Sequence, residues 1–190
     1  LKLGGEEREV SVLFSDIRGF TSMSEKLKAE DVVKTLNNYF SDMIDIVFKY
    51  NGTLDKIIGD ELMIVYGAPL AGADDTERAV QTAIEMQRRI KIINKRRIID
   101  GLIPIKVGMG INQGTVVSGN IGSRDMMDYT VIGDTVNLGA RLCSYASPDE
   151  IIVSNTVYEQ TKTMFNYCKL DSIKVKGKRR KVEIYRINYD

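Results

Sequence analysis

The chain has 190 residues, of which 43% are hydrophobic and 28% charged, and its formal net charge at pH 7 is +1. This length suits one compact domain and is too short for two of full size. A net charge near zero gives no overall attraction to nucleic acid, so we expect no nucleic-acid partner. No apolar run reaches the ~20 residues that cross a bilayer, and no signal peptide is visible, which predicts a soluble, cytoplasmic domain.

The sequence contains no histidine and only two cysteines, Cys143 and Cys168. Two cysteines cannot build a disulfide framework, and a zinc site is difficult to build without histidine, so we expect both to be buried small hydrophobes. The absence of histidine also removes the usual general base. Any catalysis must then rely on carboxylates, metal ions, lysine, arginine or the substrate itself.

The chain opens on a polar, glycine-bearing segment, which we interpret as a linker over residues 1–9, with one domain over residues 10–190. Because Leu1 is not a methionine, we expect the chain to be part of a longer protein. The near-continuous apolar segment Val10–Ile17 predicts a strand that is buried on both faces, with Asp16 at its exit. A loop bearing Gly19 follows. A carboxylate beside such a loop fits a metal and phosphate site, and it fits a turn-forming Asp equally well.

A helix is predicted over Ala29–Tyr50, followed by a β-hairpin over Thr53–Tyr66 that turns near Gly59 and Asp60. In extended chain the Cα atoms of Lys56 and Asp60 would lie about 13 Å apart, too far for one compact ligand to touch both. The two residues therefore belong to different sites, or to one site that a second copy of the chain completes. An ordinary polar turn with a solvated lysine is the alternative.

The remaining elements alternate between strands and helices. A second helix runs from Asp74 to Lys95, and Gly108 and Gly110 share one face of a following strand, where glycines usually mark close approach by another segment. Asn137 and Arg141, four residues apart on a later helix, project from one face. The expected segments are strands at Ile105–Ile111, Val116–Ile121, Met126–Ile132 and Ile151–Ser154, helices from Gly133 and over Thr156–Lys162, and two strand-like pieces around the basic run Lys174–Lys181. This order predicts an α+β fold: a ferredoxin-like split βαβ sheet with helices on one face and a C-terminal αβ extension.

Three separated segments, Val12–Thr21, Asp55–Asp60 and Tyr129–Arg141, together resemble the catalytic domain of class III nucleotidyl cyclases, the adenylate and guanylate cyclase family. The resemblance extends from about Val10 to Ile187. Three segments in the right order are far more specific than a single glycine motif. The resemblance implies that the domain converts ATP to 3′,5′-cyclic AMP and pyrophosphate, and that a regulatory domain lies upstream in the full-length protein.

The resemblance also implies a metal site and a phosphate site. Asp16 and Asp60 match the two aspartates that hold two Mg²⁺ or Mn²⁺ ions, with help from the Ile17 carbonyl. The backbone amides that would receive phosphates belong to Gly19, Phe20 and Thr21.

Further matches implied by the resemblance concern the transition state and the base. Asn137 matches the residue that orients the ribose, Arg141 the residue that meets charge on the α-phosphate, and Lys176 the lysine that contacts the terminal phosphates. Lys56 and Thr130 occupy the purine-selecting positions. Lysine can donate to N1 of adenine, which favours ATP over GTP. Thr130 stands where adenylate cyclases often have aspartate, and since threonine both donates and accepts, its discrimination would be less sharp.

In this family each active site lies between two domains, and all of its parts are present here, so we expect a homodimer with two equivalent sites. A guanylate cyclase, or a cyclase with loose purine choice, remains an alternative, as does a catalytically inactive nucleotide-binding or dimerisation module. A diguanylate cyclase is disfavoured because Ile58 precedes Gly59 and Leu62 follows Glu61, so its Gly-Gly-Asp/Glu-Glu-Phe turn is missing.

Overall fold

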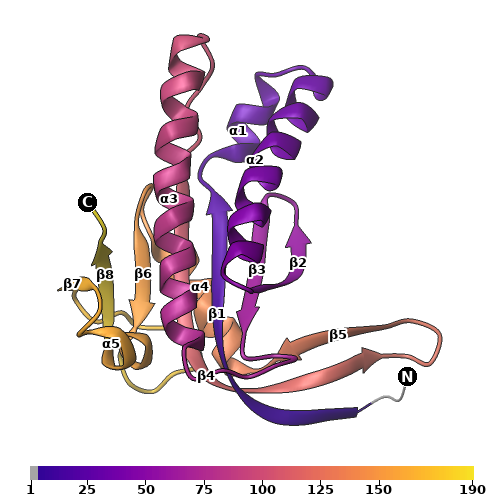
Figure 1. The fold of residues 1–190 in the computed structure, drawn as a ribbon, viewed down its shortest axis with the longest axis vertical. Helices are drawn as coiled ribbons and strands as arrows, with labels where there is room; N and C mark the ends of the chain where they lie inside the picture. The colour runs from indigo at the N-terminus through magenta and orange to yellow at the C-terminus, as the bar shows by residue number, and fades with distance from the viewer. Residues whose placement is uncertain (1–3) are drawn as a thin grey trace.

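The computed structural model describes residues 4–190 and contains the helices and strands drawn in Figure 1. In chain order they are β1 (Gly4–Ile17), α1 (Phe20–Glu25), α2 (Ala29–Lys49), β2 (Thr53–Ile58), β3 (Glu61–Tyr66), α3 (Asp75–Ile99), β4 (Val107–Gly122), β5 (Met127–Ile132), α4 (Asp134–Tyr145), β6 (Ile151–Ser154), α5 (Asn155–Thr161), β7 (Asn166–Lys169) and β8 (Ile184–Asn188).

Strand β1 lies at the centre of the sheet, where it pairs antiparallel with β3 on one side and β4 on the other. The strand order is β2-β3-β1-β4-β6-β8-β7, and β5 pairs with β4 outside this path. The first four strands, with α2 and α3, form the split βαβ unit, and β6, α5, β7 and β8 extend it at the C-terminal end. The predicted α+β fold is therefore confirmed.

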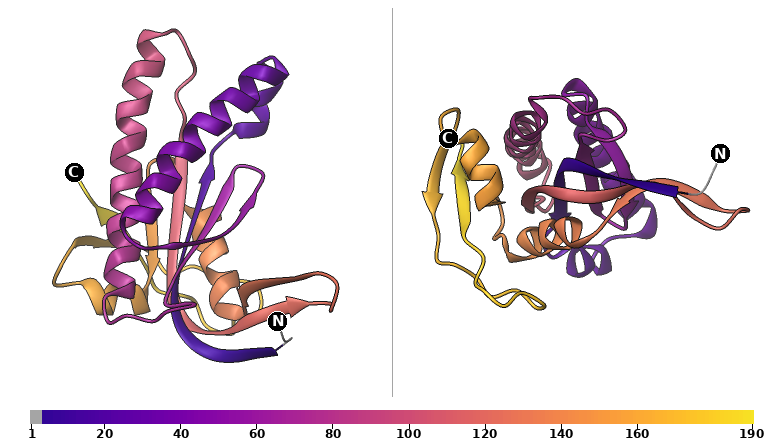
Figure 2. Two further views of the ribbon diagram at one scale, coloured as in Figure 1. Left: turned by 45° about the vertical axis from the view of Figure 1, so that its right-hand side comes forward. Right: turned by 90° about the horizontal axis from the view of Figure 1, so that it is seen from below.

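The residues of β1 alternate between two cores, because successive side chains of a strand point to opposite faces. Leu13 packs with Met43 of α2 and Met86 of α3, so these two long helices cover one face of the sheet (Figure 2). Phe14 belongs to a second core on the opposite face, with Cys143 of α4. Helix α4, which carries the predicted catalytic residues, is thus held directly against the central strand.

The predicted break between two strands at residues 112–114 is wrong, because β4 runs without interruption from Val107 to Gly122. Its partner β1 pairs with it in register from Gly4 to Ile17, and this pairing keeps residues 112–114 in extended strand. For the same reason residues 4–9, which we expected to be linker, form strand, while residues 1–3 lie outside the described residues. Beyond the body of the sheet, β4 and β5 project as an arm, along which the first residues of β1 also pair with β4 (Figure 1).

Several smaller expectations are settled by local contacts. The expected loop at Gly19 is short, because Phe20 and Thr21 already belong to helix α1. The second helix, expected from Asp74 to Lys95, runs from Asp75 to Ile99 as α3, and Asp74 forms an ion pair with Arg78. Both cysteines are free, and Cys143 is buried as predicted, whereas Cys168 is only partly buried. Within residues 4–190, no helix combines the length and the apolar character needed to cross a membrane.

Candidate functional site

Three carboxylates meet where β1 ends beside the β2–β3 turn. Asp16 is the last but one residue of β1, Asp60 lies in the turn, and Glu61 begins β3. The backbone amide of Ile17 donates to Asp60 Oδ2 across 2.9 Å. Carboxylate oxygens of Asp16 and Glu61 and the Cys143 sulfur all lie within 4.8 Å of one another. The two aspartates predicted as metal ligands are thus brought to one place, beside a third carboxylate that sequence reasoning missed.

Burial, together with repulsion from neighbouring carboxylates, raises the pKa of two members of this cluster, Asp16 and Glu61. Burial, followed by repulsion from Asp60, raises the pKa of Asp16, and the Arg18 guanidinium at 3.9 Å opposes this only in part. Burial, with Asp16 and Asp60 nearby, also raises the pKa of Glu61. Negative charge is therefore disfavoured here without a counter-ion. Hard divalent cations prefer oxygen ligands, so the carboxylate oxygens of this cluster and their electrostatics, apart from the neighbouring Cys143 sulfur, fit Mg²⁺ or Mn²⁺.

Arg18 connects this cluster to helix α4. Its guanidinium passes over Gly108 of β4 and donates to the backbone carbonyl of Cys143. A Cβ at Gly108 would collide with that guanidinium, and a Cβ at Gly110 would lie 2.7 Å from the Leu142 carbonyl carbon. The prediction that these two glycines mark close approach by other segments is confirmed.

The loop after β1 turns sharply at Gly19, which has φ 70° and caps α1. An L side chain rarely adopts this conformation, so glycine suits the position. The next two residues, Phe20 and Thr21, occupy the first turn of α1, where backbone amides have no partner within the helix. Their position directly after the carboxylate cluster is what an amide site for phosphate oxygens requires.

Lys56 and Thr130 meet through a residue that sequence reasoning missed, Asp55. Thr130 on β5 donates its hydroxyl to Asp55 Oδ2 across 2.7 Å, and Lys56 Nζ lies 3.6 Å from the same oxygen. The predicted purine-selecting pair is thus brought together within one chain. Asp55 could have been suspected from its place immediately before Lys56, because a carboxylate next to a lysine is a candidate ion-pair partner for that lysine.

Asn137 and Arg141 are both exposed on α4. Their side chains share a face, as the four-residue spacing predicted. Cys143 points its sulfur toward Asp16 and Glu61. Residues two apart on a helix point about 200° from each other, so Arg141 faces away from the carboxylates of its own chain. The structure therefore does not gather all of the predicted site residues around one point of a single chain.

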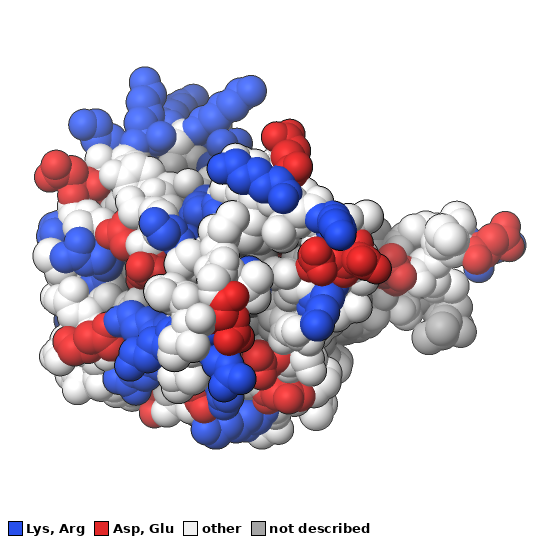
Figure 3. All heavy atoms as spheres, turned by 90° about the horizontal axis from the view of Figure 1, so that it is seen from above, with Lys and Arg blue, Asp and Glu red and all other residues white. Residues whose placement is uncertain are grey.

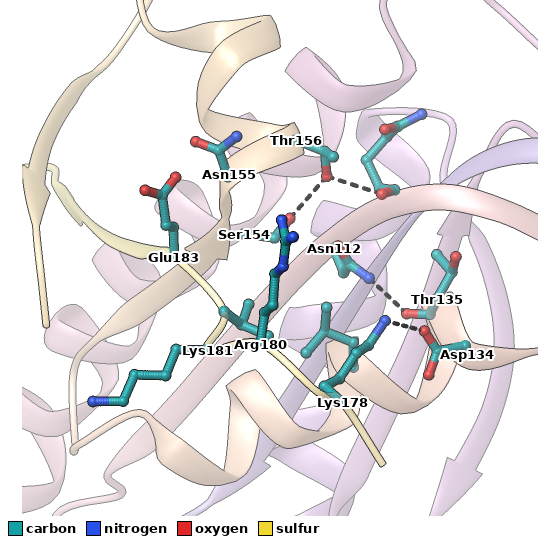
Figure 4. Close-up of a pocket in the computed structure, with 13 residues that line it drawn as sticks. Asn112, Asp134, Thr135, Ser154, Asn155, Thr156, Lys178, Arg180, Lys181 and Glu183 are labelled. Atoms are coloured by element: carbon teal, nitrogen blue, oxygen red, sulfur yellow. Dashed lines mark hydrogen bonds and ion pairs between the residues drawn. The ribbon is translucent and has the colours of Figure 1, made fainter. Parts of the chain in front are cut away.

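The basic segment between β7 and β8 turns at Gly177, where φ is 87°, and leaves Lys176 exposed. Lys and Arg side chains crowd this edge of the molecule (Figure 3). Lys178 forms an ion pair with Asp134 at the start of α4. Beside this pair lies an open polar pocket of about 400 Å³, into which Arg180 points while Lys181 points away (Figure 4). The predicted site residues are not among its lining residues.

Comparisons with known proteins agree on the family. A family model of the adenylate and guanylate cyclase catalytic domain matches residues 5–189. Adenylate cyclase 1 of Rhizobium meliloti (strain 1021) is 31% identical over 182 residues, which are 95% of this chain and 27% of that protein. The adenylate cyclase of Anabaena cylindrica is 34% identical over 195 residues, covering 95% of this chain and 37% of that protein. The chain thus spans well under half the length of these relatives.

Solved structures are similar over nearly the whole chain. The adenylyl cyclase CyaB from P. aeruginosa is 40% identical, covers 98% of this chain and 96% of its own, and has a TM-score of 0.94. The guanylyl cyclase Cya2 is 39% identical, covers 97% of this chain and 94% of its own, and has a TM-score of 0.92. Because the two named activities differ in their base and the similarities are nearly equal, the choice of purine must be argued from individual residues.

Proposed function

The chain belongs to the adenylate and guanylate cyclase catalytic domain family, and on that premise we propose that it is an adenylate cyclase domain. It converts ATP to 3′,5′-cyclic AMP and pyrophosphate by attack of the ribose 3′-oxygen on the α-phosphorus. Two copies of the chain form two equivalent sites. The observation that carries this proposal is the arrangement on α4, where Arg141 faces away from the carboxylates of its own chain.

In the proposal one copy supplies the metal side of each site. Asp16, Asp60 and the Ile17 carbonyl would hold two Mg²⁺ or Mn²⁺ ions, and the amides of Gly19, Phe20 and Thr21 would receive phosphate oxygens. The raised pKa of Asp16 supports this, since burial and Asp60 leave the carboxylates short of positive charge. When bound, such ions supply charge that stabilises the entering and leaving oxygens of an in-line displacement.

The second copy supplies the groups that hold the substrate. Arg141 stabilises charge that develops on the α-phosphate, Asn137 orients the ribose, and Lys176 contacts the terminal phosphates. Exposure of all three side chains supports this, because a site completed by another copy needs them at the surface. Positioned donors of this kind are worth about 3 to 4 kcal/mol of barrier when they meet charge that exists only in the transition state.

Adenine selection rests on Lys56. Its ammonium can only donate, and adenine presents an acceptor at N1 whereas guanine presents a donor there, so a cation favours ATP. Lys56 is exposed, and Asp55 holds its ammonium beside Thr130. The two purine-selecting residues therefore lie on one side of the site, and both come from the copy that also supplies Arg141.

The test is to incubate the purified domain, at high concentration and with Mn²⁺, with ATP or GTP and to measure the cyclic nucleotide and pyrophosphate formed. We expect cyclic AMP as the main product, and Arg141→Ala should lower its rate by about 10²- to 10³-fold. A higher kcat/KM with GTP would make the domain a guanylate cyclase. No cyclic product from either nucleotide would make it an inactive nucleotide-binding or dimerisation module.

A further inference from the structure

Asp55 occupies an unusual place on strand β2. The pairing of β2 with β3 shifts at this residue: Leu54 lies opposite Ile64 and Lys56 opposite Met63, which leaves Asp55 as the extra residue of a β-bulge. Neighbours in a regular strand point to opposite faces. A bulge re-aims one of them, and here both Asp55 and Lys56 reach the same point beside β5.

The Asp55 carboxylate is almost completely enclosed. Its side chain is 5% exposed, and Thr130 is 7% exposed. A buried carboxylate is costly unless it is paired and hydrogen-bonded. Oδ2 meets both needs, since it accepts the Thr130 hydroxyl at 2.7 Å and faces Lys56 Nζ at 3.6 Å. The three groups therefore form one small polar network in which Asp55 is the common member.

The direction of the hydrogen bond decides what Thr130 can offer a base. A hydroxyl has one proton and two acceptor lone pairs, and a carboxylate can only accept. Thr130 therefore donates its only hydroxyl proton to Asp55. Only lone pairs remain for a ligand. Adenine carries an amino group, a donor, at the 6-position, whereas guanine carries a carbonyl oxygen, an acceptor. A threonine held in this way acts as an acceptor, as an aspartate would.

We propose that Asp55 is a positioning residue that sets the purine choice of the site, because it fixes Thr130 as an acceptor for the 6-amino group and holds the Lys56 ammonium beside it. This inference rests on the proposed function, in which Lys56 and Thr130 read the base. An isolated threonine can either donate to a base or accept from it. Here the hydrogen bond to Asp55 removes the donor role, so Thr130 can only accept.

The test compares kcat/KM for ATP and for GTP in the wild-type domain and in Asp55→Asn. An asparagine can donate to the Thr130 oxygen and release its proton toward the base, so the ATP-to-GTP ratio should fall by about tenfold or more. Asp45→Asn, a change of the same kind at an exposed position on α2, should leave the ratio unchanged. The double variant Asp55→Asn/Thr130→Asp should restore the preference for ATP, since its own carboxylate supplies the acceptor.

The outcomes separate the inference from the proposed function. A wild type that prefers ATP, together with an Asp55→Asn variant that keeps this preference, would overturn the inference alone, and so would a loss of preference that Thr130→Asp does not restore. No cyclic product from the wild type would overturn the proposed function and the inference with it. If Asp55→Asn does not fold, the wild type provides the test: purine riboside triphosphate, which lacks the 6-amino group, should have about tenfold lower kcat/KM than ATP, and equal values would overturn the inference.

Discussion

The backbone amide of Ile17 donates a hydrogen bond to the Asp60 carboxylate across 2.9 Å. This contact ties the exit of the central strand to the turn between β2 and β3, two places that are 43 residues apart in the chain. It places the carboxylates of Asp16 and Asp60 side by side with Glu61 and leaves the Ile17 carbonyl on the same segment. The proposed metal side of the site is therefore positioned by a backbone hydrogen bond as well as by side-chain placement.

Stability without metal should depend on pH in a direction that the raised carboxyl pKa values set. Because the folded-state pKa of Asp16 and of Glu61 lies above the ordinary value of about 4, the folded state binds more protons than the unfolded state over the window between them. The free energy of unfolding should therefore be highest below that window and fall as pH rises through it. Thermal unfolding of the wild type in EDTA across pH 4 to 8 measures this fall in stability. The fall should be shallower in Glu61→Gln, which lacks one of the two carboxyl groups.

Divalent ions should offset the loss of stability that carboxylate repulsion causes at neutral pH. Mn²⁺ at about 100 times its Kd should stabilise the folded domain at pH 7 by about 2.7 kcal/mol, because it binds the folded carboxylates and not the unfolded chain. Asp60→Asn should abolish most of this shift while it stabilises the metal-free domain, since it removes one of the repelling charges. Differential scanning fluorimetry measures the stabilisation by Mn²⁺. An equal stabilisation of wild type and variant would place the ions elsewhere.

Lys176 should differ from its neighbours in the basic run. Lys176→Ala should lower kcat/KM for ATP by about 10- to 100-fold, as expected for the loss of a hydrogen bond to a charged phosphate. Lys174→Ala, an exposed lysine of the same run, is the matched control and should change kcat/KM less than about threefold. Equal losses in both variants would mean that the run acts through its overall charge, and the effect should then vanish at high salt.

Gly110 should be intolerant of a side chain, because a Cβ there would lie 2.7 Å from the Leu142 carbonyl carbon and 2.8 Å from the Gly139 carbonyl oxygen of α4. Gly110→Ala must push α4 off the sheet, and we expect a loss of about 3 kcal/mol or more in the free energy of unfolding. Gly101→Ala is the control: its Cβ would enter open space, and only its φ of 72° opposes it, at about 1 kcal/mol. Urea unfolding compares the two variants.

Much of the fold could be predicted because local patterns and packing agree. The apolar run of β1, the hairpin that turns at Gly59 and the paired glycines of β4 each carry their structural reason in the sequence. The uninterrupted course of β4 could not be predicted, because the polar residues 112–114 look like a turn and only the long pairing with β1 makes them strand. Local propensity is overridden there by tertiary pairing.

The site residues were named through a family resemblance, whereas the contacts between them come from the structure. That Asp16 and Asp60 meet depends on a strand and a turn that are distant in the chain. That Asp55 accepts the hydroxyl of Thr130 depends on a β-bulge, and sequence pattern does not show where pairing slips by one residue. Residues whose proposed roles depend on their partners were therefore not predicted, whereas the residues at motif positions were, and their roles stay predictions.

The central claim is that one copy of the chain supplies the carboxylates and its twin supplies Asn137 and Arg141. Asp60→Ala and Asn137→Ala should each lose activity by about 10²-fold or more. Mixed together under conditions of subunit exchange, they should regain about a quarter of wild-type activity, because one of the two sites in each mixed dimer carries neither defect. A mixture of Asp16→Ala and Asp60→Ala, whose defects lie on the same side of the site, should regain none. Native mass spectrometry shows whether the mixed dimer forms. If it forms and the mixture of Asp60→Ala and Asn137→Ala recovers no activity, the account is contradicted.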